Sequence, residues 1–194
     1  MEIKIENRPS YAIAKIELTR KEKINAETNT LVSMTNGIKI ETKAIEGENL
    51  FINTFEALND YEELILAPAS VGDIDHINLD GAFYLQSKSY LASGKDITID
   101  TQWSGSKTFF SKEDISLLKA SGKGELVFSS YGAIYKRTIK EGERYVVDTG
   151  HIIGFSDSIY YTVKYIGGIK RGKGFVVELE GPGDIFIQTR NQNN

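Results

Sequence analysis

The residues most able to carry out chemistry lie close together in the C-terminal part of the chain. They are Asp148, Thr149, Gly150 and His151, in the run YVVDTGH. An aspartate near a histidine could orient the imidazole for general base catalysis. A reaction would also need a nucleophile, and no serine occurs in a G-x-S-x-G context. The alternative is that Asp148 and Thr149 bond the backbone of a tight turn. We favour this alternative, because short polar side chains do so readily.

Gly181, Pro182 and Gly183 form a second candidate, because glycine-rich loops can hold phosphate. The run lacks the G-x-x-x-x-G-K-[ST] form, and we expect no helix after it. A type II turn, with Pro182 fixing φ and Gly183 at positive φ, fits the sequence better.

The last predicted strand ends in Gln188, Thr189 and Arg190. The Arg190 guanidinium could brace a packed loop by pairing with a carboxylate such as Asp148. It could equally face a ligand or a neighbouring subunit. We favour the brace, and we therefore predict that these motifs are structural and that the chain has no catalytic residues.

A basic, glycine-rich hairpin is the remaining candidate. Lys164, Lys170, Arg171 and Lys173 flank or lie within the run YIGGIKRGKGF. Basic side chains near aromatic rings could bind RNA. The whole chain has a net charge of −4, however, which gives no general attraction to nucleic acid. We therefore do not expect a nucleic-acid partner.

Metal and cofactor sites are not expected either. The 194-residue chain has no cysteine and two histidines, His76 and His151, which leaves no ligand set for a thiolate or clustered imidazole site. The segment DIDHINLD at 73–80 alternates acids with apolar residues, as a strand with one wet face does. The lack of cysteine fits a reducing compartment, and no apolar run is long enough for a membrane span. We expect a cytoplasmic protein.

Strict alternation of apolar and polar residues dominates the elements that must position these groups, and it predicts β-strands. It occurs at 38–41, 96–100, 159–165 and 175–180, which are rich in β-branched and aromatic residues. Two segments could each form a turn or two of helix: Phe55–Leu64, and Ser111–Leu118, which begins with a capping-box pattern. The predicted fold class is therefore all-β.

A faint internal repeat organises the predicted strands. The segments Ile24–Ser33, Tyr84–Ser93 and Tyr145–Gly154 each open apolar, cross a polar centre and close on an apolar pair. A turn and an alternating strand follow each one. We predict one β domain at 1–190 with three pseudo-repeats of about 60 residues, and a disordered tail at 191–194. An irregular β-sandwich with similar hairpins is the alternative. We also expect the two ends of the chain to lie in one layer.

Motifs at 66–74, 83–93, 119–132, 145–151 and 181–190 are spread along the chain from residue 66 to residue 190. In this order they resemble those of the altered-inheritance-of-mitochondria 24 family, also called the mitochondrial biogenesis family. The resemblance implies a fold like that of the trp RNA-binding attenuation protein, a β-sandwich or double-stranded β-helix-like architecture repeated within one chain. Eukaryotic members are linked to mitochondrial inner-membrane organisation. The resemblance gives no enzymatic activity that can be carried over to this chain.

These observations favour a non-enzymatic scaffold or interaction protein, related to membrane organisation or stress as in distant relatives. Its exposed sheet edges predict a homo-oligomer, with a trimer as the expected form, and a protein partner whose identity the sequence does not reveal. One alternative is a small-ligand-binding protein or an unrecognised enzyme that uses Asp148, His151 and Arg190. Another is an RNA-binding module that uses the basic hairpin.

Overall fold

The computed structural model describes residues 1–44, 51–101, 117–167 and 173–191. These residues form antiparallel β-sheets, which confirms the predicted all-β class. The strands are β1 (Glu2–Glu6), β2 (Ile13–Leu18), β3 (Lys23–Glu27), β4 (Leu31–Met34), β5 (Ile38–Ala44), β6 (Phe51–Ala57), β7 (Glu62–Leu66), β8 (Ile74–Gln86), β9 (Tyr90–Gly94), β10 (Ile97–Asp100), β11 (Leu117–Ser129), β12 (Ile134–Ile139), β13 (Arg144–Asp148), β14 (Ile152–Ser156), β15 (Tyr160–Gly167), β16 (Lys173–Glu180) and β17 (Gly183–Gln188). Two 3-10 helices, η1 (Ser87–Ser89) and η2 (Thr149–His151), connect strands. Within the described ranges, no helix is long and apolar enough to cross a membrane.

The strands fall into three groups with the same pairing pattern. In the N-terminal group, β2 to β7, strand β7 pairs with β2 and β4, and β6 pairs with β3 and β5. In the C-terminal group, β12 to β17, strand β17 pairs with β12 and β14, and β16 pairs with β13 and β15. In the middle group, β8 to β11, the two 13-residue strands β8 and β11 pair along their length, and β9 and β10 pair with β11.

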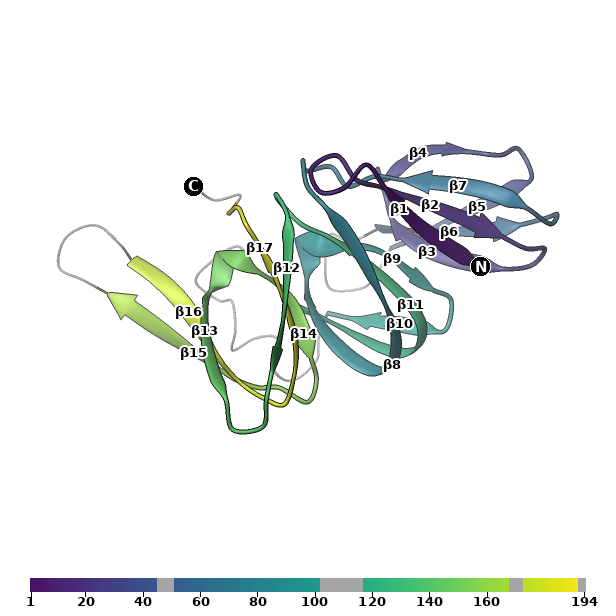
Figure 1. Cartoon of the computed structure of the whole chain (residues 1–194). Coiled ribbons are helices and arrows are strands. Elements are labelled where there is room, and N and C mark those ends of the chain that lie inside the picture. The colour runs from purple at the N-terminus through teal and green to yellow at the C-terminus, as the bar shows by residue number, and fades with distance from the viewer. Residues whose placement is uncertain (45–50, 102–116, 168–172, 192–194) are drawn as a thin grey trace.

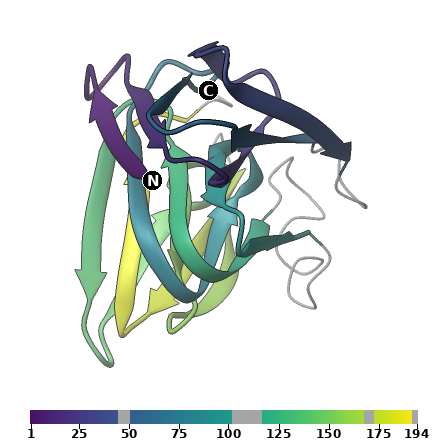
Figure 2. The same ribbon diagram turned by 90° about the vertical axis from the view of Figure 1, so that its right-hand side faces the viewer.

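One antiparallel strand pair joins each group to the next. The first junction is between β3 and β9, and the second is between β8 and β14. They fuse strands of all three groups into a ten-stranded sheet of order β12-β17-β14-β8-β11-β9-β3-β6-β5, with β10 paired to β11. The other strands form a four-stranded sheet, β1-β2-β7-β4, and a three-stranded sheet, β13-β16-β15. The groups therefore follow one another along the molecule, side by side in Figure 1 and one behind another in Figure 2.

Alternate side chains of these strands point inward and form three apolar clusters. The central cluster contains the rings of Phe83, Phe128 and Phe186, from β8, β11 and β17. The ring of Phe186 lies edge-on to that of Phe128, with 4.8 Å between centroids, and to that of Phe83, at 5.9 Å. Such edge-on contacts stabilise beyond the area they bury. They fix the middle group against the C-terminal group.

The N-terminal segment is tied to the loop between the first two groups. The guanidinium of Arg8 donates to both carboxylate oxygens of Asp73, over 2.8 and 2.9 Å. Asp73 is buried, so the fork-shaped Arg8 side chain supplies the partner that a desolvated carboxylate requires. Residues before β2 are thereby held against the start of β8.

Two expectations about the fold are wrong. Phe55–Leu64 is not helical: Phe55 and Ala57 lie in β6 and Leu64 lies in β7. All three side chains are buried, and Phe55 and Ala57 alternate with the less buried Glu56. The two chain ends do not share a layer, because β1 pairs with β2 in the four-stranded sheet and β17 pairs with β12 and β14 in the ten-stranded sheet. Of the other expected helix, residues 111–116 lie outside the described residues, as do 192–194 of the expected tail.

Candidate functional site

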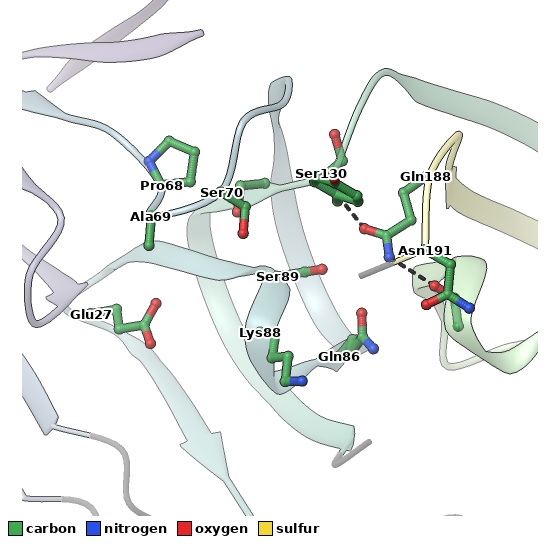
Figure 3. Close-up of a pocket in the computed structure, with 13 residues that line it drawn as sticks. Glu27, Pro68, Ala69, Ser70, Gln86, Lys88, Ser89, Ser130, Gln188 and Asn191 are labelled. Atoms are coloured by element: carbon green, nitrogen blue, oxygen red, sulfur yellow. Dashed lines mark hydrogen bonds between the residues drawn. The ribbon is translucent and has the colours of Figure 1, made fainter. Parts of the chain in front are cut away.

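A cavity of about 220 Å³ lies where loops of the three strand groups meet (Figure 3). Its wall comes from the end of β3, the loop before β8, the η1 helix, the loop after β11 and the segment after β17. These parts of the chain are spread from residue 27 to residue 191, and the group junctions bring them together. Most of the lining residues are polar, and they include serine hydroxyls, glutamine amides, the carboxylate of Glu27 and the ammonium group of Lys88.

Gln188 spans one side of this cavity. Its side-chain oxygen accepts a hydrogen bond from the Tyr131 backbone amide over 2.9 Å, and its side-chain nitrogen donates to the Gly150 carbonyl over 2.8 Å. Both ends of the amide are therefore engaged by backbone (Figure 3). The side chain is buried, where an unpaired amide would be costly. Gln188 therefore holds η2 against the loop after β11.

Glu27 is the acidic group of the cavity. It ends β3 and is half-buried, and burial raises the pKa of its carboxyl from 4.5 to about 7. Desolvation favours the neutral form of an acid, because the charged form loses more solvation when water is removed. Near neutral pH this carboxyl can therefore either donate or accept a hydrogen bond.

The run from Asp148 to His151 forms the η2 turn. The Asp148 carboxylate accepts from the Gly150 amide over 2.9 Å, and the Thr149 hydroxyl donates to the Phe175 carbonyl over 3.0 Å. Nδ1 of His151 lies 2.8 Å from the Gln188 carbonyl oxygen, so it must carry the proton of this contact. The ring nitrogen that a catalytic aspartate would orient thus faces the backbone.

Gly181, Pro182 and Gly183 connect β16 to β17. The Gly181 amide donates to the Glu143 carbonyl over 3.0 Å. A Cβ on Gly183 would lie 2.7 Å from a side-chain carbon of Ile159, so a larger residue would have to displace that side chain. The expected type II turn is wrong, since Gly183 has a φ of 159° and already belongs to β17. Because β17 follows directly, no helix N-terminus is present to bind a phosphate.

The expected brace between Arg190 and Asp148 is also wrong. The Arg190 side chain is exposed and donates to the Thr189 carbonyl over 3.3 Å. Among the ion pairs of the described residues, none joins it to Asp148. The Thr189 hydroxyl instead accepts from the Ala133 amide over 2.9 Å, which ties the chain after β17 to the start of β12.

The basic hairpin is described only in part. Lys170 and Arg171 lie outside the described residues, and Lys173 begins β16. The Lys164 ammonium lies 2.7 Å from the Glu178 carboxylate of the neighbouring strand. This contact neutralises the basic residue of the hairpin whose side chain is described.

The structure thus adds Glu27 and Lys88 to the candidate site, and it joins them to Gly150 and Gln188 of the sequence motifs. No local spacing in the sequence could have identified Glu27 or Lys88, because one is a single charged residue at the end of a strand and the other lies within a three-residue 3-10 helix. The arrangement can hydrogen-bond a small polar molecule. It contains no paired nucleophile and base among the described residues.

Comparisons with known proteins place this geometry among related chains. The family model described as "Mitochondrial biogenesis AIM24" matches residues 3–190. The crystal structure of the protein SPYM3_0169 from Streptococcus pyogenes superposes with a TM-score of 0.80 at 22% identity, over 99% of this chain and 94% of that one. The two therefore share a fold. A comparison with curated proteins gave no match.

Proposed function

This chain belongs to the mitochondrial biogenesis AIM24 family, and we propose that it is a non-enzymatic scaffold that works as an assembly of several copies. The polar groups of its most enzyme-like motif are engaged by backbone, as the contacts of Asp148, Thr149 and His151 illustrate. The exposed edge strand β4 gives the scaffold proposal its positive support. The family description suggests a link to mitochondrial biogenesis, which for this chain is part of the proposal.

The observation that carries the proposal is the exposure of β4. Its residues Leu31, Val32 and Met34 are 39%, 58% and 38% exposed. The strands with the same place in the other two groups, β9 and β14, are buried along nearly their whole length. An apolar edge strand is a ready site for pairing with another chain, and proteins usually cover or charge such edges. β4 has no charged residue, and within the described ranges it pairs with β7 on one side and with no strand on the other.

We propose in addition that the three strand groups are pseudo-repeats of one ancestral unit within a single domain at 1–190, as in a fold like that of the trp RNA-binding attenuation protein. Two observations support this proposal. The pairing pattern is the same in each group. Positive φ angles also recur at Lys21, Gly81 and Gly142, which are about 60 residues apart. Lys21 lies between β2 and β3, Gly142 lies between β12 and β13, and Gly81 lies within the long strand β8.

The lack of cysteine supports a cytoplasmic location.

Light scattering coupled to size-exclusion chromatography tests the scaffold proposal. The chain has a mass of 21.6 kDa, and at micromolar concentration we expect a multiple of that mass, with about 65 kDa for the proposed trimer. A mass of one chain across the concentration range would overturn the proposal.

A second candidate function, binding of a small polar ligand, is favoured by the cavity with Glu27 and Lys88. A thermal-shift screen with amino acids, nucleosides and small carboxylates tests it. We expect a binder to raise the melting temperature of the wild type but not of Lys88→Ala.

RNA binding by the hairpin is the third candidate, and salt-dependent binding to mixed RNA would identify it.

A further inference from the structure

The two internal junctions complete a six-stranded sheet in the same way. In the first, the order β8-β11-β9 continues through the junction into β3-β6-β5. In the second, β12-β17-β14 continues into β8-β11, with β10 paired to β11. Each junction therefore joins the last strand of one three-stranded half to the first strand of another. The half that ends in β9 or β14 always comes from the group later in sequence.

The two ends of the molecule carry one unjoined half each. The N-terminal group presents β2-β7-β4, which ends in β4, the equivalent of β9 and β14. The C-terminal group presents β13-β16-β15, which begins with β13, the equivalent of β3 and of the second part of β8. Among the described residues, β4 pairs with β7 alone and β13 pairs with β16 alone. The molecule therefore holds both halves of a third six-stranded sheet, but does not join them.

We propose that β4 of one copy pairs antiparallel with β13 of a second copy and completes this third sheet. The inference rests on the proposed scaffold function and names its partner as a second copy of this chain. The two strands of one copy cannot meet, because they lie at opposite ends of the molecule (Figure 1). Each copy offers one strand of each kind, so the contact is head-to-tail, and repeated joining gives a closed ring or an open filament.

The internal junctions also give the register of the proposed junction between β4 and β13. Ile24, Tyr84 and Tyr145 open the three equivalent segments of the sequence. In the first junction Ile24 faces Gly94, ten residues beyond Tyr84, and in the second Tyr84 faces Phe155, ten residues beyond Tyr145. The same step places Tyr145 opposite Met34, ten residues beyond Ile24. The neighbouring pairs follow from antiparallel geometry and are Ser33 with Val146 and Val32 with Val147.

The side chains of the two edges suit this register. Val146, at the centre of β13, is 51% exposed, as an apolar residue on an open edge would be. Met34 would lie against the ring of Tyr145, a favourable contact for a thioether. The other face of that ring is held by the guanidinium of Arg137, 4.4 Å from the ring centroid. None of the six paired residues is charged, so no ion has to be desolvated when the edges join.

Disulfide trapping tests the register directly, because the chain contains no cysteine. The variant carrying both Ser33→Cys and Val146→Cys places two thiols on directly opposed residues, within the range that a disulfide can bridge. Mild oxidation should convert it into covalent multimers on a non-reducing gel, and reduction should return them to one chain. The matched internal control is Asn25→Cys with Ser93→Cys, an observed pair at the equivalent positions, which should give a disulfide within one chain.

The outcomes separate this inference from the proposed function. Multimers with Ser33→Cys plus Val146→Cys, and none with either single variant, support the β4–β13 pairing. If light scattering shows an oligomer and the control pair oxidises, but the double variant gives no multimers, the pairing is refuted and the scaffold proposal stands. If light scattering shows a single chain, both are refuted. Multimers from Val146→Cys alone would indicate a symmetric contact and would also refute the head-to-tail pairing.

Discussion

At the scale of residues, Glu27 is the side chain whose chemistry the fold alters most clearly. Its carboxyl has a pKa of about 7 in the folded protein, raised by burial at the edge of the cavity, against 4.5 when exposed. As pH rises from about 4.5 to about 7, the unfolded chain loses this proton while the folded chain keeps it. The free energy of unfolding therefore falls across this window. It is unaffected by this group below the window and falls no further above it.

We predict that Glu27→Gln removes this loss. Glutamine keeps the shape and hydrogen-bonding capacity of the protonated acid but does not ionise. The free energy of unfolding of the variant, relative to that of the wild type, should therefore increase by about 1 kcal/mol from pH 4 to pH 8. This value is smaller than the full linkage energy because the side chain is partly exposed. Chemical denaturation at both pH values measures the gain. Glu17→Gln, at an exposed position of β2, is the control, and an equal gain there would contradict the assignment to Glu27.

The candidate site was predictable from the sequence only where its residues are neighbours in the chain. The turn-capping role proposed for Asp148 involves a partner two residues away, at Gly150. The contacts of Gln188, by contrast, reach residues 38 and 57 positions away. The Arg190 prediction failed for the same reason, because it needed the relative position of two loops that only the packed groups determine. Single charged residues such as Glu27 carry no signal until the groups assemble.

At the scale of elements, alternation located most strands but not their lengths. β8 and β11 are continuous over 13 residues, whereas the other groups use two shorter strands in the same places. Gly81 bends β8 at the position where the C-terminal group has a turn at Gly142, and both have positive φ. A glycine in such a place is compatible with a bend or a turn. The sequence alone could not decide between them, nor recognise the turn between β6 and β7, whose Tyr61 also has positive φ.

A glycine at the meeting of two loops gives the prediction at this scale. Gly72 forms bridges with Tyr11 and Gly132, and a Cβ on it would lie 1.8 Å from the Ser130 carbonyl oxygen. Backbone must move to admit alanine, so Gly72→Ala should lower the free energy of unfolding by about 2–4 kcal/mol. Gly94→Ala is the matched control, because its nearest contact would be an ordinary 3.6 Å. Urea denaturation compares the two, and equal midpoints would contradict the steric argument.

At the scale of the whole molecule, the open arrangement of the groups determines which surfaces remain for partners. Three groups and two junctions leave one half-sheet at each end, as a segment of a longer array would. Arrays of similar units need covered ends, because each unit buries its strands against its neighbours. The sequence indicated three similar segments, but it did not show that the array stays open. That depends on the relative position of the first and last groups.

The exposure of Val32 provides a test, in solution, of the proposed contact between copies through β4. Val32 is 58% exposed in β4, whereas its equivalents Ala92 and Ile153 are fully buried at the internal junctions. A lysine at position 32 would cost a single copy little, but joining two copies would desolvate its charge. Val32→Lys should therefore weaken association by about 100-fold or more and leave the melting temperature of the separated chain unchanged. Ile40→Lys, a similar change on exposed β5, should leave association intact. Analytical ultracentrifugation measures both, and an undiminished oligomer with Val32→Lys would show that β4 is not the contact.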